Sequence, residues 1–192
     1  MKEQAVIERV RRWIAGFVIA LDLCPFANRV FDGGRIRYVV SEATDVSGLL
    51  ADLERELRTL IATPIDSIET TLLIHPHVLG DFLDYNDFLG EADQLLGELG
   101  LVGTIQIASF HPEYQFAGTK PAAVENYTNR SPYPMLHLLR EASVTAVAAD
   151  VDALREIPRR NIATMRRLGL AAVRERFMRV WTPDGSQRLD GG

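Results

Sequence analysis

The chain has 192 residues, of which 21 are lysine or arginine and 26 are aspartate or glutamate, so its net charge is −5 at pH 7. Its 47% apolar and 24% charged residues are typical of a water-soluble globular protein. The negative charge argues against nucleic acid as the main partner, and no apolar stretch approaches the roughly 20 residues that cross a bilayer. A single cysteine excludes an intramolecular disulfide, and we expect a cytoplasmic protein without a membrane partner.

Three segments have the periodicity of amphipathic helices. Apolar residues recur every three or four positions over residues 6–23, and again over residues 45–63 and 78–99. Pro25 ends the first segment, because proline disfavours helical backbone at the residue before it. Asp45 has the side chain of a helix N-cap and begins the second segment. We therefore expect three helices that each turn an apolar stripe toward the core.

Short apolar runs between these helices predict strands at residues 36–40, 68–74 and 104–110. Helices between successive strands favour parallel pairing through right-handed crossovers. We therefore expect an α/β fold, a single domain over residues 1–183 in which helices pack on a small, mostly parallel sheet, followed by a flexible tail over residues 184–192. The alternative is an α+β ferredoxin-like sandwich with mixed pairing.

The pattern is less regular in the rest of the chain. Residues 111–133 have no clean period, and a loop of this length inside a compact domain is usually functional or disordered. Its aromatic residues argue against disorder. A short helix is expected over residues 134–140 and a fourth strand over residues 144–148. The C-terminal third reads as helical, with Pro158 in a first turn and a break near Gly169.

Two histidine–proline pairs close two of the predicted strands. His75 precedes a proline and so does His111, each at the end of an apolar run. Proline favours extended backbone at the preceding residue and cannot donate to a sheet ladder, so each histidine marks a strand end. If the two strands are parallel neighbours, both imidazoles emerge at the same edge of the sheet, where α/β proteins bind ligands. This edge is the candidate site.

Three interpretations of the histidines remain open. His75, His77 and His111 are candidate ligands of a divalent metal ion, because imidazole is a good metal ligand. One of them is otherwise a general acid or base, or activates Cys24 as a nucleophile. In the third interpretation each imidazole binds loop carbonyls and is structural. Cys24 follows a helix rather than opening one and also reads as a small buried hydrophobe. His137 lies on the predicted short helix, as a wall or capping residue.

Donor-rich residues gather just before that short helix. Asn129, Arg130 and Ser131 stand where free backbone N–H groups and the helix dipole would favour an anion. Arg130 is the candidate clamp for a carboxylate or phosphate, with Tyr127 and Glu113 as further substrate-binding residues. The alternative is an ordinary helix cap without a ligand.

The stretch over residues 109–119, which reads Ser-Phe-His-Pro-Glu-Tyr-Gln-Phe-Ala-Gly-Thr, is quite specific. With residues 21–27, 70–76, 85–89 and 125–143, it resembles a bacterial family known only as domain of unknown function 1415. The resemblance covers nearly the whole chain. It implies a cytoplasmic bacterial protein and brings no established catalytic roles with it.

These observations predict a small-molecule enzyme acting on an anionic or polar substrate through histidine acid/base or metal-assisted chemistry. The alternative is a non-catalytic module that binds a metabolite or another protein. A third hypothesis, a nucleic-acid accessory protein, rests on the eight arginines and two glutamates of residues 155–179. They form a basic helical face that could meet phosphates or an acidic partner, although a solvated face is the commoner reason for such a pattern.

Overall fold

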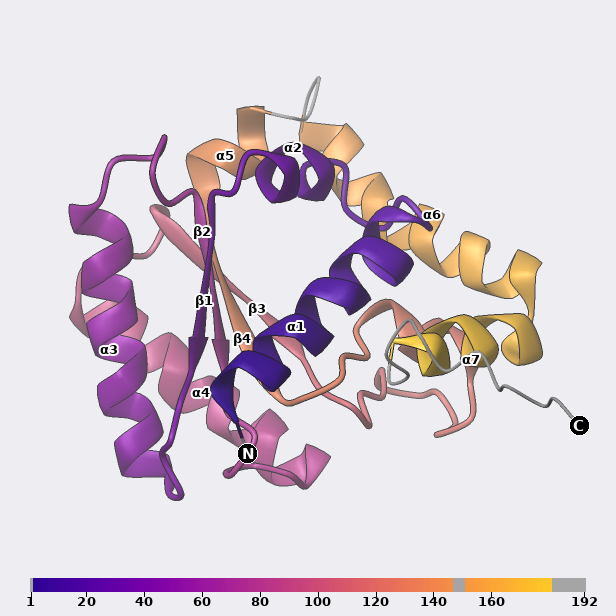
Figure 1. The fold of residues 1–192 in the computed structure, drawn as a ribbon, viewed down its shortest axis with the longest axis horizontal. Helices are drawn as coiled ribbons and strands as arrows, with labels where there is room; N and C mark the ends of the chain where they lie inside the picture. The colour runs from indigo at the N-terminus through magenta and orange to yellow at the C-terminus, as the bar shows by residue number, and fades with distance from the viewer. Residues whose placement is uncertain (1, 147–150, 181–192) are drawn as a thin grey trace, which may run out of the picture.

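The computed structural model describes residues 2–146 and 151–180, and its centre is a four-stranded sheet (Figure 1). The strands are β1 (Ile36–Val40), β2 (Thr70–Ile74), β3 (Ile105–Phe110) and β4 (Met135–Arg140), in the order β1-β2-β4-β3. β1 and β2 are parallel, whereas β4 is antiparallel to both β2 and β3. The predicted α/β class is confirmed, but the sheet is mixed rather than mostly parallel.

The mixed pairing is due to β4, which we expected to be a short helix. This prediction is wrong, because Met135–Arg140 is a central strand with apolar side chains on both faces. Leu136 and Leu138 are buried against one layer of helices, and Met135 is buried against the other. A strand that is covered on both sides shows no alternation of apolar and polar residues, so periodicity cannot separate it from a buried helix.

Two helices cover one face of the sheet. α3 (Val46–Ala62) connects β1 to β2, and α4 (Phe82–Glu98) connects β2 to β3. Their leucines, with Tyr85 and Phe88 of α4, pack on Leu73 of β2. Asp45 caps α3 as expected, since its side chain accepts a hydrogen bond from the Gly48 N–H at 2.8 Å. Because α4 separates β2 from β3 and only a 3-10 helix stands between β3 and β4, the chain order also differs from the βαββαβ order of a ferredoxin-like sandwich.

The other face carries the first and last helices of the described chain. α1 (Glu3–Trp13) continues directly into the π-helix η1 (Ile14–Ile19), and α6 (Val151–Leu168) and α7 (Leu170–Arg179) pack on the same side (Figure 1). Their apolar side chains form one cluster with Leu72 and other residues of the sheet. The sheet is therefore the middle layer of three.

Two short helices were not predicted. α2 (Ala27–Asp32) follows Cys24, and α5 (Glu141–Ala146) occupies most of the segment expected to be a fourth strand. That strand prediction is wrong for residues 144–146, while residues 147 and 148 lie outside the described part of the chain. Pro158 lies inside α6 rather than in a first turn, whereas the break at Gly169 is confirmed.

The long segment between β3 and β4 is ordered by its own side chains. It contains the 3-10 helix η2 (Val124–Thr128), in which Asn126 is fully buried. The Asn126 amide accepts from the Phe116 N–H at 3.0 Å and donates to the Lys120 carbonyl at 2.9 Å. The tail expected over residues 184–192 lies outside the described residues, and no helix within the described residues is long and apolar enough to cross a membrane.

Candidate functional site

His75 and His111 do emerge at the same edge of the sheet. β2 and β3 run in the same direction, because each is antiparallel to β4, which lies between them. The two strands are therefore not neighbours, but their carboxyl ends still lie at the same edge of the sheet. Both imidazoles contact the ring of Tyr85 on α4, with centroid separations of 5.7 Å for His75 and 5.1 Å for His111.

The backbone occupies most of the nitrogen atoms of these two histidines. His75 Nδ1 lies 3.0 Å from the Val78 carbonyl oxygen, and His111 Nε2 lies 3.2 Å from that of Leu79. The Glu113 N–H donates to His111 Nδ1 at 3.0 Å, so Nε2 carries the proton of the neutral ring. His75 Nε2 is buried and has no hydrogen-bond partner in the part of the chain that the structure describes.

Burial also keeps both imidazoles uncharged. Each has no exposed surface, and desolvation lowers the pKa of His75 to about 4 and lowers that of His111 from its ordinary value. Together they hold a turn in which Leu79 has a φ of 57°, a backbone conformation that side chains disfavour. These hydrogen bonds are the ones expected of structural histidines.

The other residues predicted for this edge bind the protein itself. Arg130 donates to the carbonyl oxygens of Tyr114 and Pro121, and its guanidinium lies 4.6 Å from the ring centroid of Tyr127. The Asn129 amide donates to the Ser109 carbonyl, and the buried Ser131 hydroxyl to that of Tyr133. No helix begins at Ser131, because β4 follows, so the expected helix N-terminus is absent there.

The described residues give no support to a metal centre. They contain no group of three or more His, Cys, Asp or Glu side chains that could hold a metal ion. His77 is exposed, while both other proposed ligands are buried. Glu113 and Arg130 instead border an open hollow of about 560 Å³ outside the histidines, together with Asp81 and Gln115.

A different site lies on the opposite face of the sheet. There, a partly open cavity of about 80 Å³ lies between the sheet, η1 and α2. Its wall consists of apolar and aromatic side chains and three residues with reactive or polar groups. The lining residues are Trp13, Ile14, Val18, Cys24, Phe26, Ala27, Val30, Ile36, Thr70, Leu72, Phe110 and His137.

Cys24 enters this wall from the loop between η1 and α2. Burial raises the pKa of its thiol, while the backbone N–H groups of Phe26 and Ala27 act in the opposite direction. The cysteine therefore does stand before a helix, contrary to our expectation, because α2 was not predicted. The net effect of the surroundings is a protonated thiol at neutral pH.

His137 faces the same cavity from β4. Its Nε2 lies 2.7 Å from the hydroxyl oxygen of Thr70, and that hydroxyl donates to the Leu138 carbonyl at 2.6 Å. Because the hydroxyl proton is committed to Leu138, the hydroxyl oxygen accepts from His137, so Nε2 carries the ring proton. His137 Nδ1 then has a free lone pair, and it has no hydrogen-bond partner among the described residues. Burial lowers the pKa of His137 to about 4, so the ring is a neutral base.

The loop that carries Cys24 is held in a strained conformation. Asp22 has a φ of 52°, and α6 secures this segment through two side chains. Arg160 donates to the Asp22 carbonyl and Asn161 to that of Leu23, each at 2.7 Å. Just before the loop, η1 supplies Ile14 to the cavity wall. π-helical turns and left-handed non-glycine residues both concentrate at functional sites.

Several arginines of the basic C-terminal face also have partners within the protein. Arg166 of α6 pairs with Glu125 of η2 at 2.9 Å, and Arg159 pairs with Glu156 at 2.8 Å. The Arg166 pair attaches α6 to η2 and the contacts of Arg160 attach it to the Cys24 loop, whereas the Arg159 pair lies within α6. The predicted basic surface is thus partly used to hold the fold together.

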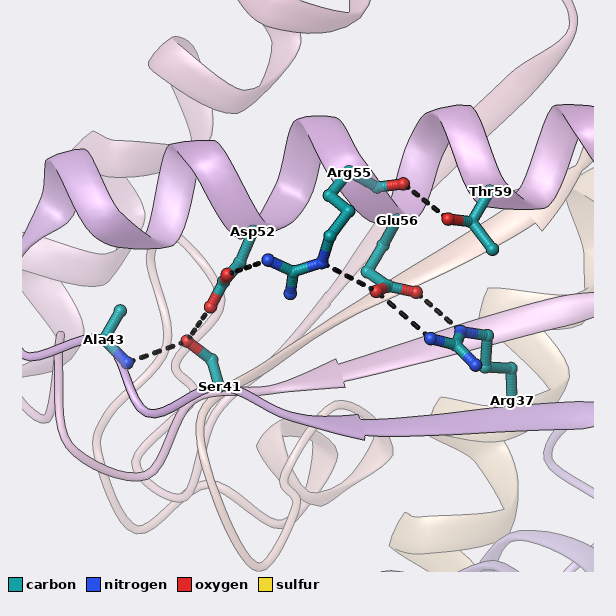
Figure 2. A network of polar contacts seen from close by, with 7 residues as sticks. All are labelled: Arg37, Ser41, Ala43, Asp52, Arg55, Glu56 and Thr59. Atoms are coloured by element: carbon teal, nitrogen blue, oxygen red, sulfur yellow. Dashed lines mark hydrogen bonds and ion pairs between the residues drawn. The ribbon is translucent and has the colours of Figure 1, made fainter.

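A polar cluster that was not predicted from the sequence lies between β1 and α3 (Figure 2). Glu56 is buried on α3, and its carboxylate accepts from Arg37 at 2.7 and 3.3 Å and from Arg55 at 3.4 Å. Asp52 pairs with Arg55 and accepts from the Ser41 hydroxyl. Both carboxylates have cationic partners, so we interpret the cluster as a link between the strand and the helix.

His137 was placed on the wrong element by sequence reasoning, and with it the site was missed. The signal that could have found it is the length of the apolar run between Pro134 and Arg140, which suits a strand better than a helix. A central strand would have set His137 beside β2 and brought it toward Thr70.

Comparisons with known proteins give a family but no activity. A model of the family described as protein of unknown function (DUF1415) matches residues 5–175. No curated protein matches the chain, and no solved structure matches it. The family match covers most of the 192 residues, including the Cys24 loop, both histidine–proline pairs and β4. The chain therefore belongs to the DUF1415 family, as its resemblance had implied.

Proposed function

We propose that the protein is a small-molecule enzyme in which Cys24 is the nucleophile and His137 the general acid and base. The observation that carries the proposal is the presence of both groups in the wall of one small cavity, with an unbonded nitrogen on the histidine. A buried thiol with a raised pKa is a weak nucleophile by itself. A neutral imidazole at the same cavity supplies the base that such a thiol needs.

The reaction class that fits these two groups is acyl transfer to water. The Cys24 sulfur forms a bond to the carbonyl carbon of an ester or thioester while His137 Nδ1 accepts the thiol proton. The bond from the carbonyl carbon to the leaving group breaks, and the imidazolium returns the proton to that group. Water then attacks the thioester and gives a proton to Nδ1, and the sulfur leaves as the thiol by taking this proton.

The lining of the cavity restricts the range of substrates more than the sequence did. Among the described residues, no charged side chain borders the cavity. Burying an ionised group without a partner is costly, so the reacting part of the substrate is uncharged. A carboxylate or phosphate elsewhere on the substrate would stay outside. The expectation of an anionic or polar substrate therefore applies, at most, to the part that remains in solvent.

Acylation by p-nitrophenyl acetate tests the proposal. The protein should release one equivalent of p-nitrophenol in a burst and gain one acetyl group, which peptide mapping by mass spectrometry assigns to Cys24. Cys24→Ala should abolish the burst, and His137→Gln should slow it by about a hundredfold, within the usual range for loss of a general base. His77→Gln, a change at an exposed histidine, is the matched control. Acetylation that is independent of His137 would contradict the proposed base.

The pH dependence of this burst separates a base from a merely structural histidine. His137 has a pKa of about 4 and the thiol pKa is raised, so wild-type acylation should be nearly constant from about pH 5.5 to 8. In His137→Gln the rate should instead rise in proportion to hydroxide, because only the thiolate then reacts. Parallel profiles for the two proteins would refute general-base catalysis.

A non-catalytic binding module remains the second candidate, and the apolar lining favours it. A cavity whose walls are almost wholly hydrophobic can hold a ligand without any chemistry. In that case p-nitrophenyl acetate leaves Cys24 unmodified, while small apolar ligands still raise the melting temperature.

A further inference from the structure

The size and wall chemistry of the cavity point to a substrate class. We infer that the Cys24 cavity takes the short aliphatic part of a carbonyl compound, about two to four carbons long, and excludes longer chains. This inference rests on the proposed function only in taking the cavity as the place where the substrate binds. It specifies which molecules fit the cavity and which side chain excludes the longer ones.

The volume sets the upper limit. The cavity measures about 80 Å³, roughly half of the ~150 Å³ apolar cavity that accommodates benzene, a ligand with six heavy atoms. About three or four heavy atoms of an aliphatic chain fill such a space. Protein interiors are close-packed, so a longer chain could enter only by displacing side chains that are themselves buried.

Val30 of α2 is the side chain best placed to set that limit. It lines the cavity, is fully buried, and packs with Phe26 and Leu139 in the small cluster beneath α2. A side chain packed on several sides cannot move away from a longer ligand. Removing its two methyl groups would extend the cavity without touching Cys24 or His137.

The wall and its two reactive groups suit a carbonyl. The wall presents almost only apolar surface and, among the described residues, no charged side chain. A carbonyl group carries no net charge and can enter such a space at little cost compared with an ion. The thiol of Cys24 and the free nitrogen of His137 are the groups that react at a carbonyl carbon.

A binding experiment on full-length Cys24→Ala tests this inference apart from any acylation. The probes are unreactive methyl ketones of increasing length, from acetone to 2-octanone, and binding is followed through the NMR shifts of the Thr70 and His137 amides. We expect acetone and 2-butanone to bind, and 2-octanone to bind at least about tenfold more weakly. Val30→Ala in the same background should extend the length limit by about two carbons.

The matched control removes the same two methyl groups on the other face. Val39 of β1 packs in the α3/α4 layer, so Val39→Ala should leave the length limit unchanged. Equal binding of short and long ketones, or a limit that Val30→Ala does not move, would overturn the inference. If this happens while p-nitrophenyl acetate still acylates Cys24, the proposed function stands without its size selection. If the ketones show the limit but Cys24 is never acylated, the cavity is a binding site for this class only, and the enzymatic proposal fails.

Discussion

The two faces of one sheet bury histidine in opposite ways. On the α3/α4 face, His75 and His111 pack on Tyr85, and backbone groups bind three of their four ring nitrogens. On the α1/α2 face, His137 borders a cavity, and one of its nitrogens has no partner among the described residues. Burial alone therefore does not mark a functional histidine. His75 and His137 each have one nitrogen without a partner among the described residues; the difference is that His137 borders a cavity, whereas His75 Nε2 is buried.

The same contrast appears in the backbone. Among the described residues, only Asp22 and Leu79 are non-glycine residues with positive φ, and each lies beside one of the two histidine sites. Leu79 belongs to the turn that the two structural histidines hold. Asp22 belongs to the loop that brings Cys24 to the cavity. The strained conformation at Leu79 is stabilised by the core, whereas the one at Asp22 positions a reactive group.

Acid should destabilise the protein mainly through the α3/α4 face of the sheet, where His75 and His111 are buried. The pKa of His75 is about 4 in the folded protein and 6.5 ordinarily, so folding favours the neutral ring. The resulting stability is fully present above pH 6.5 and is lost as the pH falls toward 4, by about 3 kcal/mol for His75. His137, whose pKa is lowered to the same value, should lose a comparable amount, but the α3/α4 face adds His111, whose pKa is also lowered.

Urea unfolding at several pH values measures this effect. Relative to wild type, His75→Gln and His137→Gln should each lose much of their stability deficit between pH 7 and pH 4. The exposed His77→Gln should follow wild type throughout. A deficit of His75→Gln that stays constant between pH 7 and pH 4 would contradict the lowered pKa of this histidine.

Replacement of His111 should unfold the turn before α4. His111→Ala removes a buried ring and leaves the Leu79 carbonyl and the Glu113 N–H without their partners. We expect a loss of about 3 kcal/mol, from the cavity and the unpaired backbone groups together. His137→Gln should cost less than half of this, measured by the same urea unfolding. A His111→Ala protein of unchanged stability would mean that this histidine is held for chemistry instead.

Much of this difference between the two faces could not be predicted from the sequence, for physical reasons. The β1, β2 and β3 positions were predicted because each is a short run between clear helices, and the two histidine–proline pairs located the shared edge correctly. The histidine–proline pattern could not say that carbonyls would occupy the nitrogens. β4 was missed because a strand buried on both faces lacks alternation, and α2 was missed because six residues carry little periodicity. Both errors fell on the walls of the cavity.

Loss of the Arg37–Glu56 ion pair on the α3/α4 face should have an intermediate effect on the free energy of unfolding. Arg37→Met leaves the Glu56 carboxylate, which is 1% exposed, with only the longer contact to Arg55. Since the Arg37 side chain is itself 39% exposed, we expect a loss of about 2 kcal/mol, less than for a fully buried pair. Arg58→Met, which removes an exposed i,i+4 pair on the same helix, should cost within about 0.5 kcal/mol. Equal losses in chemical denaturation would show that burial of Glu56 adds nothing.

The smallest effect should come from the strained residue of the Cys24 loop. Asp22 is exposed, and α6 binds its backbone carbonyl, which any substitution keeps. Its positive φ is disfavoured for residues with a Cβ, so Asp22→Ala should be about 1 kcal/mol less stable than Asp22→Gly. At the exposed Asp66, which lacks a positive φ, alanine should instead be the more stable of the two. If Asp22→Gly also keeps the acylation rate of Cys24, the loop positions the thiol through its backbone conformation. A slower rate with unchanged stability would show that the Asp22 carboxylate itself acts on the thiol, whose pKa it helps to raise.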